Sequence, residues 1–356
     1  MNLSNWTHLL VQHKNESVSR MASMAVPSVM FAAGVFGNSL ALVVLYNSRK
    51  EQKQSVFYRL VGALAITDLF GTCATSPVTL VVYANGLEWQ GGQPLCNYAS
   101  FMMIFAGLSS IFTLAAMALD RYLALNRPYF YSSHVNPSRV KFLFPVLMTA
   151  ALIMGCLPLI GIGKNVHHFP GTWCFFDYYG TTPRIQTFAY LYSLLGLTAL
   201  TFIVILNSVV LRTVWSLHRK ACEIQMVVFL IGILTVVSVC WAPLMIRVFL
   251  IQTGLKQKDV IQDLVFIRMA SFNQILDPWV YILFRKTFLT RLIQFTKVHL
   301  CLSKKEFDPK QSGGQDREEI KRLRHAKVDQ QFNSKADEPF CNESTGEATE
   351  IVNCRN

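Results

Sequence analysis

Charged residues are scarce in this sequence, and the common catalytic and metal-binding motifs are missing from it. Only 15% of the 356 residues are charged, whereas 52% are apolar and the mean hydropathy is +0.34; a soluble domain usually has about 25% charged residues. No Cys-x-x-Cys pair, Walker-type phosphate loop or His-Glu-x-x-His motif occurs. The sequence therefore predicts a polytopic membrane protein that is not an enzyme, with no cofactor, no metal site and no nucleic-acid partner.

The N-terminal stretch 1–22 lacks an apolar run of signal-peptide length. It is polar and holds three Asn-x-Ser/Thr sequons, at Asn2, Asn5 and Asn15. Glycan acceptors must reach the lumen, so three sequons this close together favour an extracellular tail. We expect glycosylation at these asparagines, and we expect the first membrane segment to act as an uncleaved signal anchor.

Seven apolar segments follow, and each is long enough to cross a bilayer as a helix. They are Val26–Tyr46, Phe57–Tyr83, Cys96–Leu123, Val140–Ile162, Phe188–Val214, Ile224–Leu250 and Val260–Leu283. Lys and Arg gather in the connections that follow the first, third and fifth segments, whereas the connections that follow the second, fourth and sixth segments hold few. By the positive-inside rule the N-terminus lies outside and the C-terminus inside. The expected fold is an all-α membrane protein with a seven-helix bundle in residues 23–295.

The chain beyond the seventh segment changes character. Basic and apolar residues alternate at helical spacing over 284–293, which predicts a short amphipathic helix on the inner membrane face. Cys301, shortly after it, is either palmitoylated or a free thiol. From Ser303 to Asn356 the chain is polar and poor in aromatics, so we expect residues 296–356 to form a disordered cytoplasmic tail.

Two ionisable residues, Arg268 and Asp277, stand out within the seventh segment. A charge at bilayer depth costs several kcal/mol, so each is a candidate for function. They lie nine residues, or about 14 Å, apart along a helix and cannot pair with each other. The structural alternatives are a snorkelling interfacial cation for Arg268 and a satisfied buried carboxylate beside a proline kink for Asp277.

Several motifs resemble those of rhodopsin-like G-protein-coupled receptors. They are Gly37-Asn38, Asp68, Asp120-Arg121-Tyr122, Cys240-Trp241-Ala242-Pro243 and Asp277-Pro278-Trp279-Val280-Tyr281. The resemblance implies that Asp120, Arg121 and Tyr122 couple to a G protein. It also implies an activation switch made of Asp68, Trp241, Pro243, Asp277, Pro278 and Tyr281. Asp68 and Asp277 would face the bundle interior, where they hold either a water network or a cation.

A narrower set of residues resembles the prostanoid receptors within that class. Arg268 with the following Gln274-Ile275-Leu276-Asp277-Pro278-Trp279 is similar to their seventh helix, where an arginine receives the carboxylate of a lipid. Gly171-Thr172-Trp173-Cys174-Phe175 resembles the loop that these receptors fold over the ligand. Trp173 is therefore either a lid or an interfacial anchor, and the lid is favoured. The resemblance implies a ligand site of Arg268, Thr172, Trp173, Thr79, Tyr83, Ser271, Met30 and Met103.

The disulfide and a second arginine complete the candidate residues. Cys96 begins the third segment and Cys174 lies in the second outer loop, so both face an oxidising compartment and we expect a disulfide between them. Arg247 lies one turn beyond Pro243 towards the outside. It is either a second polar contact or a plain interfacial cation, and the interfacial cation is favoured.

Absences also separate the classes of ligand. The fourth segment has no tryptophan, the fifth has no proline, and the outer half of the third has no aspartate to serve as counter-ion for an amine. Prostanoid receptors share these departures. The most similar segments, Ser48–Lys53, Ser76–Thr79, Gly91–Cys96 and Arg247–Phe249, resemble the fourth E-type subfamily. The Trp241 motif and a short third inner loop fit that subfamily less well, so a related E-type paralogue stays open.

The resemblance implies a plasma-membrane receptor for prostaglandin E2 that raises cyclic AMP through a stimulatory G protein, with arrestin and receptor kinases as further partners. The alternatives are another prostanoid, coupling to a calcium-mobilising or inhibitory G protein, and a lipid transporter. A transporter usually shows internal repeats or paired broken helices, and neither is evident here. A membrane enzyme would need a catalytic group at depth, whereas the histidines here lie mainly in loops and tails.

Overall fold

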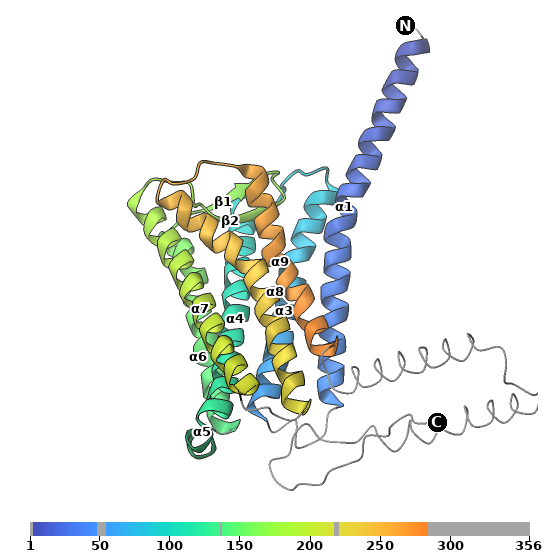
Figure 1. Cartoon of the computed structure of the whole chain (residues 1–356). Coiled ribbons are helices and arrows are strands. Elements are labelled where there is room, and N and C mark those ends of the chain that lie inside the picture. Colours follow the sequence, from blue (N-terminus) through green and yellow to red (C-terminus); the bar gives the residue numbers. More distant parts are fainter. Residues whose placement is uncertain (1–2, 48–54, 136, 217–220, 284–356) are drawn as a thin grey trace, which may run out of the picture. The chain divides into compact units, whose positions relative to one another are not determined.

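Long helices make up most of the computed structural model, which describes residues 3–47, 55–135, 137–216 and 221–283 (Figure 1). The helices are α1 (Leu3–Tyr46), α3 (Val56–Ala84), α4 (Gly92–Asn126), α5 (Pro128–His134), α6 (Pro137–Cys156), α7 (Pro183–Ser216), α8 (Ala221–Gln252) and α9 (Val260–Leu283). A 3-10 turn, η1 (Leu157–Ile160), continues α6. Asn2, the expected amphipathic helix, Cys301 and the tail 296–356 lie outside the described residues.

The described helices confirm a multi-pass membrane protein. Six stretches are long and apolar enough to cross a bilayer: Met24–Tyr46, Val56–Ala84, Gly92–Asn126, Phe142–Ile160, Pro183–Ser216 and Ile231–Gln252. Such runs form helices because a backbone in lipid must satisfy its hydrogen bonds within its own segment. The seventh helix, α9, has 24 residues and is therefore about 36 Å long. It is not among these six stretches, and it carries three ionisable residues, Asp263, Arg268 and Asp277.

Neighbouring helices close a ring. Each helix contacts the next in the order α1, α3, α4, α7, α8, α9, and α9 contacts α1 again. Helix α6 packs on the outside of α4. Gly37 allows the close contact between α1 and α9, because a Cβ atom there would lie 3.0 Å from Pro278 and 3.1 Å from the indole nitrogen of Trp279. The sequence motifs Gly37-Asn38 and Asp277-Pro278 therefore meet at one helix interface.

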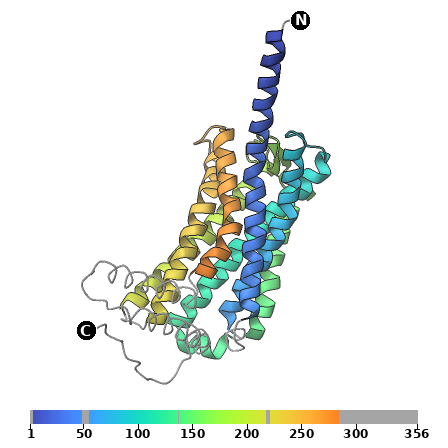
Figure 2. The same cartoon turned by 90° about the vertical axis from the view of Figure 1, so that its right-hand side faces the viewer.

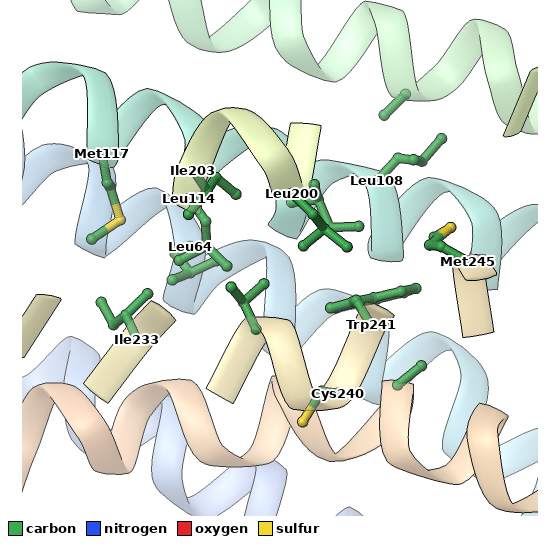
Figure 3. Packing of buried hydrophobic residues seen from close by; sticks show 14 of the residues in the cluster. Leu64, Leu108, Leu114, Met117, Leu200, Ile203, Ile233, Cys240, Trp241 and Met245 are labelled. Carbon is green, nitrogen blue, oxygen red and sulfur yellow. The ribbon is translucent and has the colours of Figure 1, made fainter. Parts of the chain in front are cut away.

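The core of the ring is filled by aliphatic side chains around Trp241. Figure 3 labels the buried residues of this cluster: Leu64, Leu108, Leu114, Met117, Leu200, Ile203, Ile233, Cys240, Trp241 and Met245. Trp241 is 5% exposed and packs directly on Gly107 of α4, where a Cβ atom would lie 2.3 Å from the ring. Cys240 points from the same helix towards α9 (Figure 3). The α4–α8 interface thus has no room for a side chain at position 107.

A short hairpin covers one end of the ring. Strand β1 (Asn165–His168) pairs antiparallel with β2 (Trp173–Phe176), in the register that joins Asn165 to Phe176 and His168 to Trp173. Figure 1 places this hairpin at one end of the bundle and α5 at the other. We call these the hairpin end and the α5 end. Helix α1 extends past the bundle at the hairpin end, since it begins already at Leu3 and not at Val26 (Figures 1 and 2).

Candidate functional site

A cavity of about 130 Å³ opens inside the ring near the hairpin end. Its walls come from α1, α3, α4 and α9 and from the loop that enters β2. All eight residues that the sequence proposed as ligand contacts line it: Met30, Thr79, Tyr83, Met103, Thr172, Trp173, Arg268 and Ser271. The fold thus brings together side chains from four helices and a loop that are distant in sequence.

Arg268 projects into this cavity from α9. Its Nη2 donates a hydrogen bond to the hydroxyl of Tyr83 on α3, at 3.0 Å. Among the residues that the structure describes, no carboxylate lies within ion-pair distance of it. The surrounding wall is largely apolar and includes Leu264 and Ile267. A guanidinium in this setting has most of its donors available for an anionic group of a ligand.

A polar stripe on α3 forms another wall of the cavity. Thr72, Thr75, Thr79 and Tyr83 all line it, and their spacing of three or four residues places them on one face of the helix. Sequence reasoning proposed the last two and missed the first two, although the spacing was visible. Gln274 of α9 was also missed; its Oε1 lies 3.5 Å from the hydroxyl of Thr72.

Trp173 covers the cavity from the hairpin. It is 7% exposed, and its indole N–H donates to the carbonyl oxygen of Phe169 at 2.9 Å. The ring of His168 stacks on it at 4.5 Å, and Tyr178 stacks on His168 at 4.9 Å. A buried, stacked indole over the cavity has the position of a lid and does not face lipid.

His168 is held neutral by its surroundings. Its Nε2 lies 3.2 Å from the carbonyl oxygen of Phe176, to which it donates in the tautomer that carries the proton there. Burial lowers the pKa of His168 to about 4, against smaller opposing effects of that hydrogen bond and of Asp263 and Asp177. The ring therefore packs as an uncharged aromatic between its two stacking partners at neutral pH.

The expected disulfide is confirmed. Cys96 of α4 and Cys174 of β2 are bonded, with 5.2 Å between their Cα atoms. Ser100 of α4 also donates to the side-chain oxygen of Asn165 in β1 at 2.7 Å. Both strands are thus attached to α4. His167 lies within 4.8 Å of both sulfur atoms, but sulfurs joined in a disulfide offer no thiolate to a metal ion.

A second, more polar cavity of about 440 Å³ also borders the lid. It is lined by Val166, His167, His168, Phe169, Trp173, Asp177, Tyr179, Gly180, Lys258, Val260 and Asp263. Trp173 lines both cavities. We call them the inner and the outer cavity.

Arg247 is not an interfacial cation, and that expectation is wrong. The residue is 4% exposed, and its Nε donates to Oδ1 of Asp263 at 3.0 Å. Its Nη2 donates to the carbonyl oxygen of Gln257 at 2.9 Å. Oδ2 of Asp263 accepts a hydrogen bond from the Tyr179 hydroxyl. Sequence reasoning overlooked Asp263, although opposite charges on adjoining helices were a signal for it.

Below the inner cavity, a smaller space of about 40 Å³ leads towards Trp241. It shares Ile267, Ser271 and Gln274 with the inner cavity, and Trp241 forms part of its wall. Pro243 lies inside α8 two residues further on. A side chain that bends the helix is thus adjacent to one that touches the space below the candidate ligand site.

Asp68 and Asp277 both face the bundle interior, as expected. Both are buried and line one space of about 10 Å³, together with Pro278 and Tyr281. Ser110 donates to Oδ1 of Asp68 at 2.5 Å, and Asn273 donates to Oδ2 of Asp277 at 2.7 Å. The space is about the size of one water. A water network and a bound cation both stay predictions.

At the α5 end, Asp120 and Arg121 form an ion pair. Tyr131 of α5 donates to the other oxygen of Asp120 at 2.9 Å, and the Arg121 guanidinium lies 4.6 Å from the centre of the Phe57 ring. Tyr122 is half-buried and packs against the core. The motif is therefore held by contacts from α3 and α5, at the end of the ring remote from the cavities.

Residues 37–281 match the 7 transmembrane receptor (rhodopsin family). A prostaglandin E2 receptor EP4 subtype of Oryctolagus cuniculus is 36% identical, and the match covers 81% of this chain and 71% of the relative. The EP4 subtype of Homo sapiens is 35% identical, with 78% and 67% covered. The prostaglandin E2 receptor EP3 subtype of Homo sapiens is also 35% identical, with 76% and 79% covered.

Proposed function

Because the chain belongs to the rhodopsin family of seven-transmembrane receptors, we propose that it is a plasma-membrane receptor for prostaglandin E2 that raises cyclic AMP through a stimulatory G protein. The N-terminus and the hairpin end then lie outside the cell, and the α5 end lies inside. The similarity to EP4 and EP3 receptors supports the ligand. Members of this family are receptors, so the membrane-enzyme hypothesis is set aside.

The observation that carries the proposal is Arg268 in the inner cavity. An acidic lipid needs one cation and a large apolar wall, and the cavity combines Arg268 with Met30, Met103 and Ile267. The planar guanidinium can meet a carboxylate with two parallel hydrogen bonds. Tyr83 already accepts from arginine Nη2, so it holds the fork in place while the remaining donors point to the ligand.

Competition binding of prostaglandin E2 and its methyl ester tests this role. Arg268→Ala removes the charge partner of the acid, and truncating one partner of a desolvated charge pair costs about 2–5 kcal/mol, or roughly 30- to 4,000-fold in affinity. We expect that loss for the acid and a much smaller one for the ester. Arg268→Lys should recover only part, because an ammonium lacks the fork.

Arg184→Ala is the matched control, because Arg184 is an exposed arginine at the start of α7 that does not line the cavity. It should leave both affinities unchanged at equal surface expression. If Arg268→Ala weakens acid and ester by the same factor, the arginine is structural and the proposed carboxylate contact is wrong.

The choice of a stimulatory G protein rests on similarity to EP4 receptors, because the chemistry of the described residues at the α5 end does not favour one G protein over another. The Asp120–Arg121 pair would open to release Arg121 to its partner. A cell assay for cyclic AMP and calcium tests the choice: cyclic AMP suppression or calcium release alone would contradict it.

Labelled-ligand uptake into sealed vesicles, compared with ligand-dependent nucleotide exchange, separates a receptor from a lipid transporter. Arrestin and receptor kinases are proposed as later partners.

A further inference from the structure

One buried carboxylate at the hairpin end joins three parts of the fold. Asp263, at the start of α9, is 3% exposed. It accepts from Arg247 of α8 on one oxygen and from Tyr179, in the loop after β2, on the other. Arg247 is buried too and adds a bond to the carbonyl oxygen of Gln257, in the α8–α9 connection. Breaking such a pair leaves an uncompensated charge, so the three groups depend on one another.

The tyrosine of this network is rigidly attached to the lid. Oδ1 of Asp177, the residue after β2, accepts from the backbone N–H of Tyr179 at 2.8 Å and of Gly180 at 3.0 Å. This turn fixes Tyr179 relative to the strand that begins with Trp173. Burial, and next the hydrogen bond to Asp263, raise the pKa of the Tyr179 hydroxyl. The hydroxyl therefore keeps its proton and remains a donor.

The aspartate is equally attached to Arg268, because both belong to α9. Five residues separate them, which places them about 140° apart around the helix and about 7.5 Å apart along it. Asp263 is bound on the α8 side, and Arg268 is bound to Tyr83 on the α3 side. Two anchors at different angles and heights fix both the rotation and the position of this end of α9.

We propose that Asp263, Arg247 and Tyr179 form a positioning set, which holds α9 and the lid at a fixed separation so that Arg268 and Trp173 close on an acidic ligand together. The inference rests on the proposed function of Arg268. Asp263 and Arg247 aim the cation, and Tyr179 keeps the lid closed. None of the three lines the inner cavity, so their effect on the ligand is exerted through Arg268 and Trp173.

The two parts of the set predict different binding defects. Tyr179→Phe removes one hydroxyl that donates to a carboxylate, worth about 1.5–3 kcal/mol or roughly 10- to 160-fold. We expect prostaglandin E2 to dissociate faster by about that factor, with the ratio of acid to ester affinity unchanged. Asp263→Asn leaves Arg247 unpaired and releases α9. We expect the acid to lose about 10-fold or more in affinity and the acid-to-ester ratio to fall.

The test measures affinities of acid and methyl ester, and dissociation rates, at matched surface expression. Tyr190→Phe is the control: it removes a tyrosine hydroxyl that binds the carbonyl oxygen of Gln252 in the same region, 2.8 Å away, without contact to Asp263. The effects of Tyr179→Phe and Asp263→Asn on the dissociation rate should not multiply in the double variant, because both changes act on the same contact. Arg247→Lys keeps the charge and should retain part of the acid-to-ester ratio.

Three results would overturn the inference. Equal dissociation rates for Tyr179→Phe and Tyr190→Phe would show that Tyr179 does not keep the lid closed. If Asp263→Asn lowers the affinities for acid and ester by the same factor, the network only stabilises the fold and does not position Arg268. Wild-type protein that does not prefer the acid would overturn the proposed function as well, whereas a wild-type preference with unchanged variants overturns the inference alone. If Asp263→Asn does not reach the surface, Tyr179→Phe and Arg247→Lys decide.

Discussion

Arg268 and Arg247 lie on adjoining helices and meet opposite environments. Arg247 is buried and neutralised by Asp263, so its charge is used within the fold. Arg268 is half-buried beside a hydroxyl and an open space, so its charge is offered to something outside the described residues. An arginine keeps its charge in both settings. The location of the counter-charge therefore makes Arg268, and not Arg247, the candidate for binding an anionic ligand.

At the same scale, His168 predicts a pH dependence of the lid. Its pKa is about 4 in the folded lid and about 6.5 when the ring is exposed. The closed lid is favoured by the neutral His168 ring, and this stabilisation of the closed lid is fully present above pH 6.5. It is lost as the pH falls towards 4, because His168 in the open lid takes up its proton at a higher pH than in the closed lid. At pH 5.5 the loss is about 1.4 kcal/mol. We expect ligand dissociation to be about tenfold faster at pH 5.5 than at pH 7.5.

His168→Phe keeps a stacked ring without a titrating group, so its dissociation rate should be nearly independent of pH over this range. His167→Gln is the control, because His167 is the exposed neighbour and its loss should leave the wild-type dependence. Comparing variants at each pH removes the effect of the ligand's own carboxyl. A similar pH response in wild type and His168→Phe would contradict the prediction.

At the scale of helices, the contact between Gly107 and Trp241 predicts a stability effect. Gly107→Ala places a methyl group 2.3 Å from the indole ring, and overpacking of this kind costs about 1–3 kcal/mol. The thermal midpoint of the detergent-solubilised protein should fall. Trp241→Phe removes the ring atoms nearest to the new methyl group, so the double variant should be more stable than the sum of the two single effects implies.

Gly62→Ala in α3 is the matched control, because a Cβ atom there meets only the Leu45 side chain at 3.8 Å. Its thermal midpoint should stay close to that of the wild type or rise slightly. An unchanged midpoint for Gly107→Ala would show that α4 and α8 can separate at this contact without cost.

The helices were more predictable than the parts between them. The seventh segment was predicted at its observed bounds, Val260–Leu283, and the third lies within α4, because apolar run length alone determines a span. The hairpin was not predicted: β2 is buried along all four residues, so it shows no alternation of apolar and polar side chains. Residues 3–22 were expected as a polar tail, and hydropathy carries no signal for the helix observed there.

At the scale of the whole molecule, the proposed sidedness of the chain, which rests on charge and sequons, makes a simple prediction. Asn2, Asn5 and Asn15 should carry glycans, because the N-terminus is proposed to be extracellular. Endoglycosidase treatment of intact cells should lower the apparent mass, and replacing all three by Gln should abolish the shift. Asn342 also precedes a Ser two residues on and should stay unmodified inside. A shift that survives the triple change would place the C-terminus outside.

The composition of the candidate ligand site was largely predictable from local motifs, whereas the contacts that support it were not. Arg268 and Trp173 each stand in a recognisable stretch, and the ring of helices places both around the inner cavity. The link from Asp263 to Tyr179 joins residues 84 positions apart, which only the packing of α9 against the hairpin loop brings together. Long-range polar pairs of this kind have no local pattern, so they appear only once helices are packed.

Trp173 borders both the inner and the outer cavity, and this matters to anyone who designs compounds for the molecule. A chemist who joins one fragment for the inner cavity to another for the outer cavity must pass the connecting atoms beside a single indole. The linker therefore has to be slim, and a bulky one would be tolerated only with the ring swung aside. Such a two-headed compound would bind slowly, since the indole must move before it can be seated, and would leave slowly for the same reason.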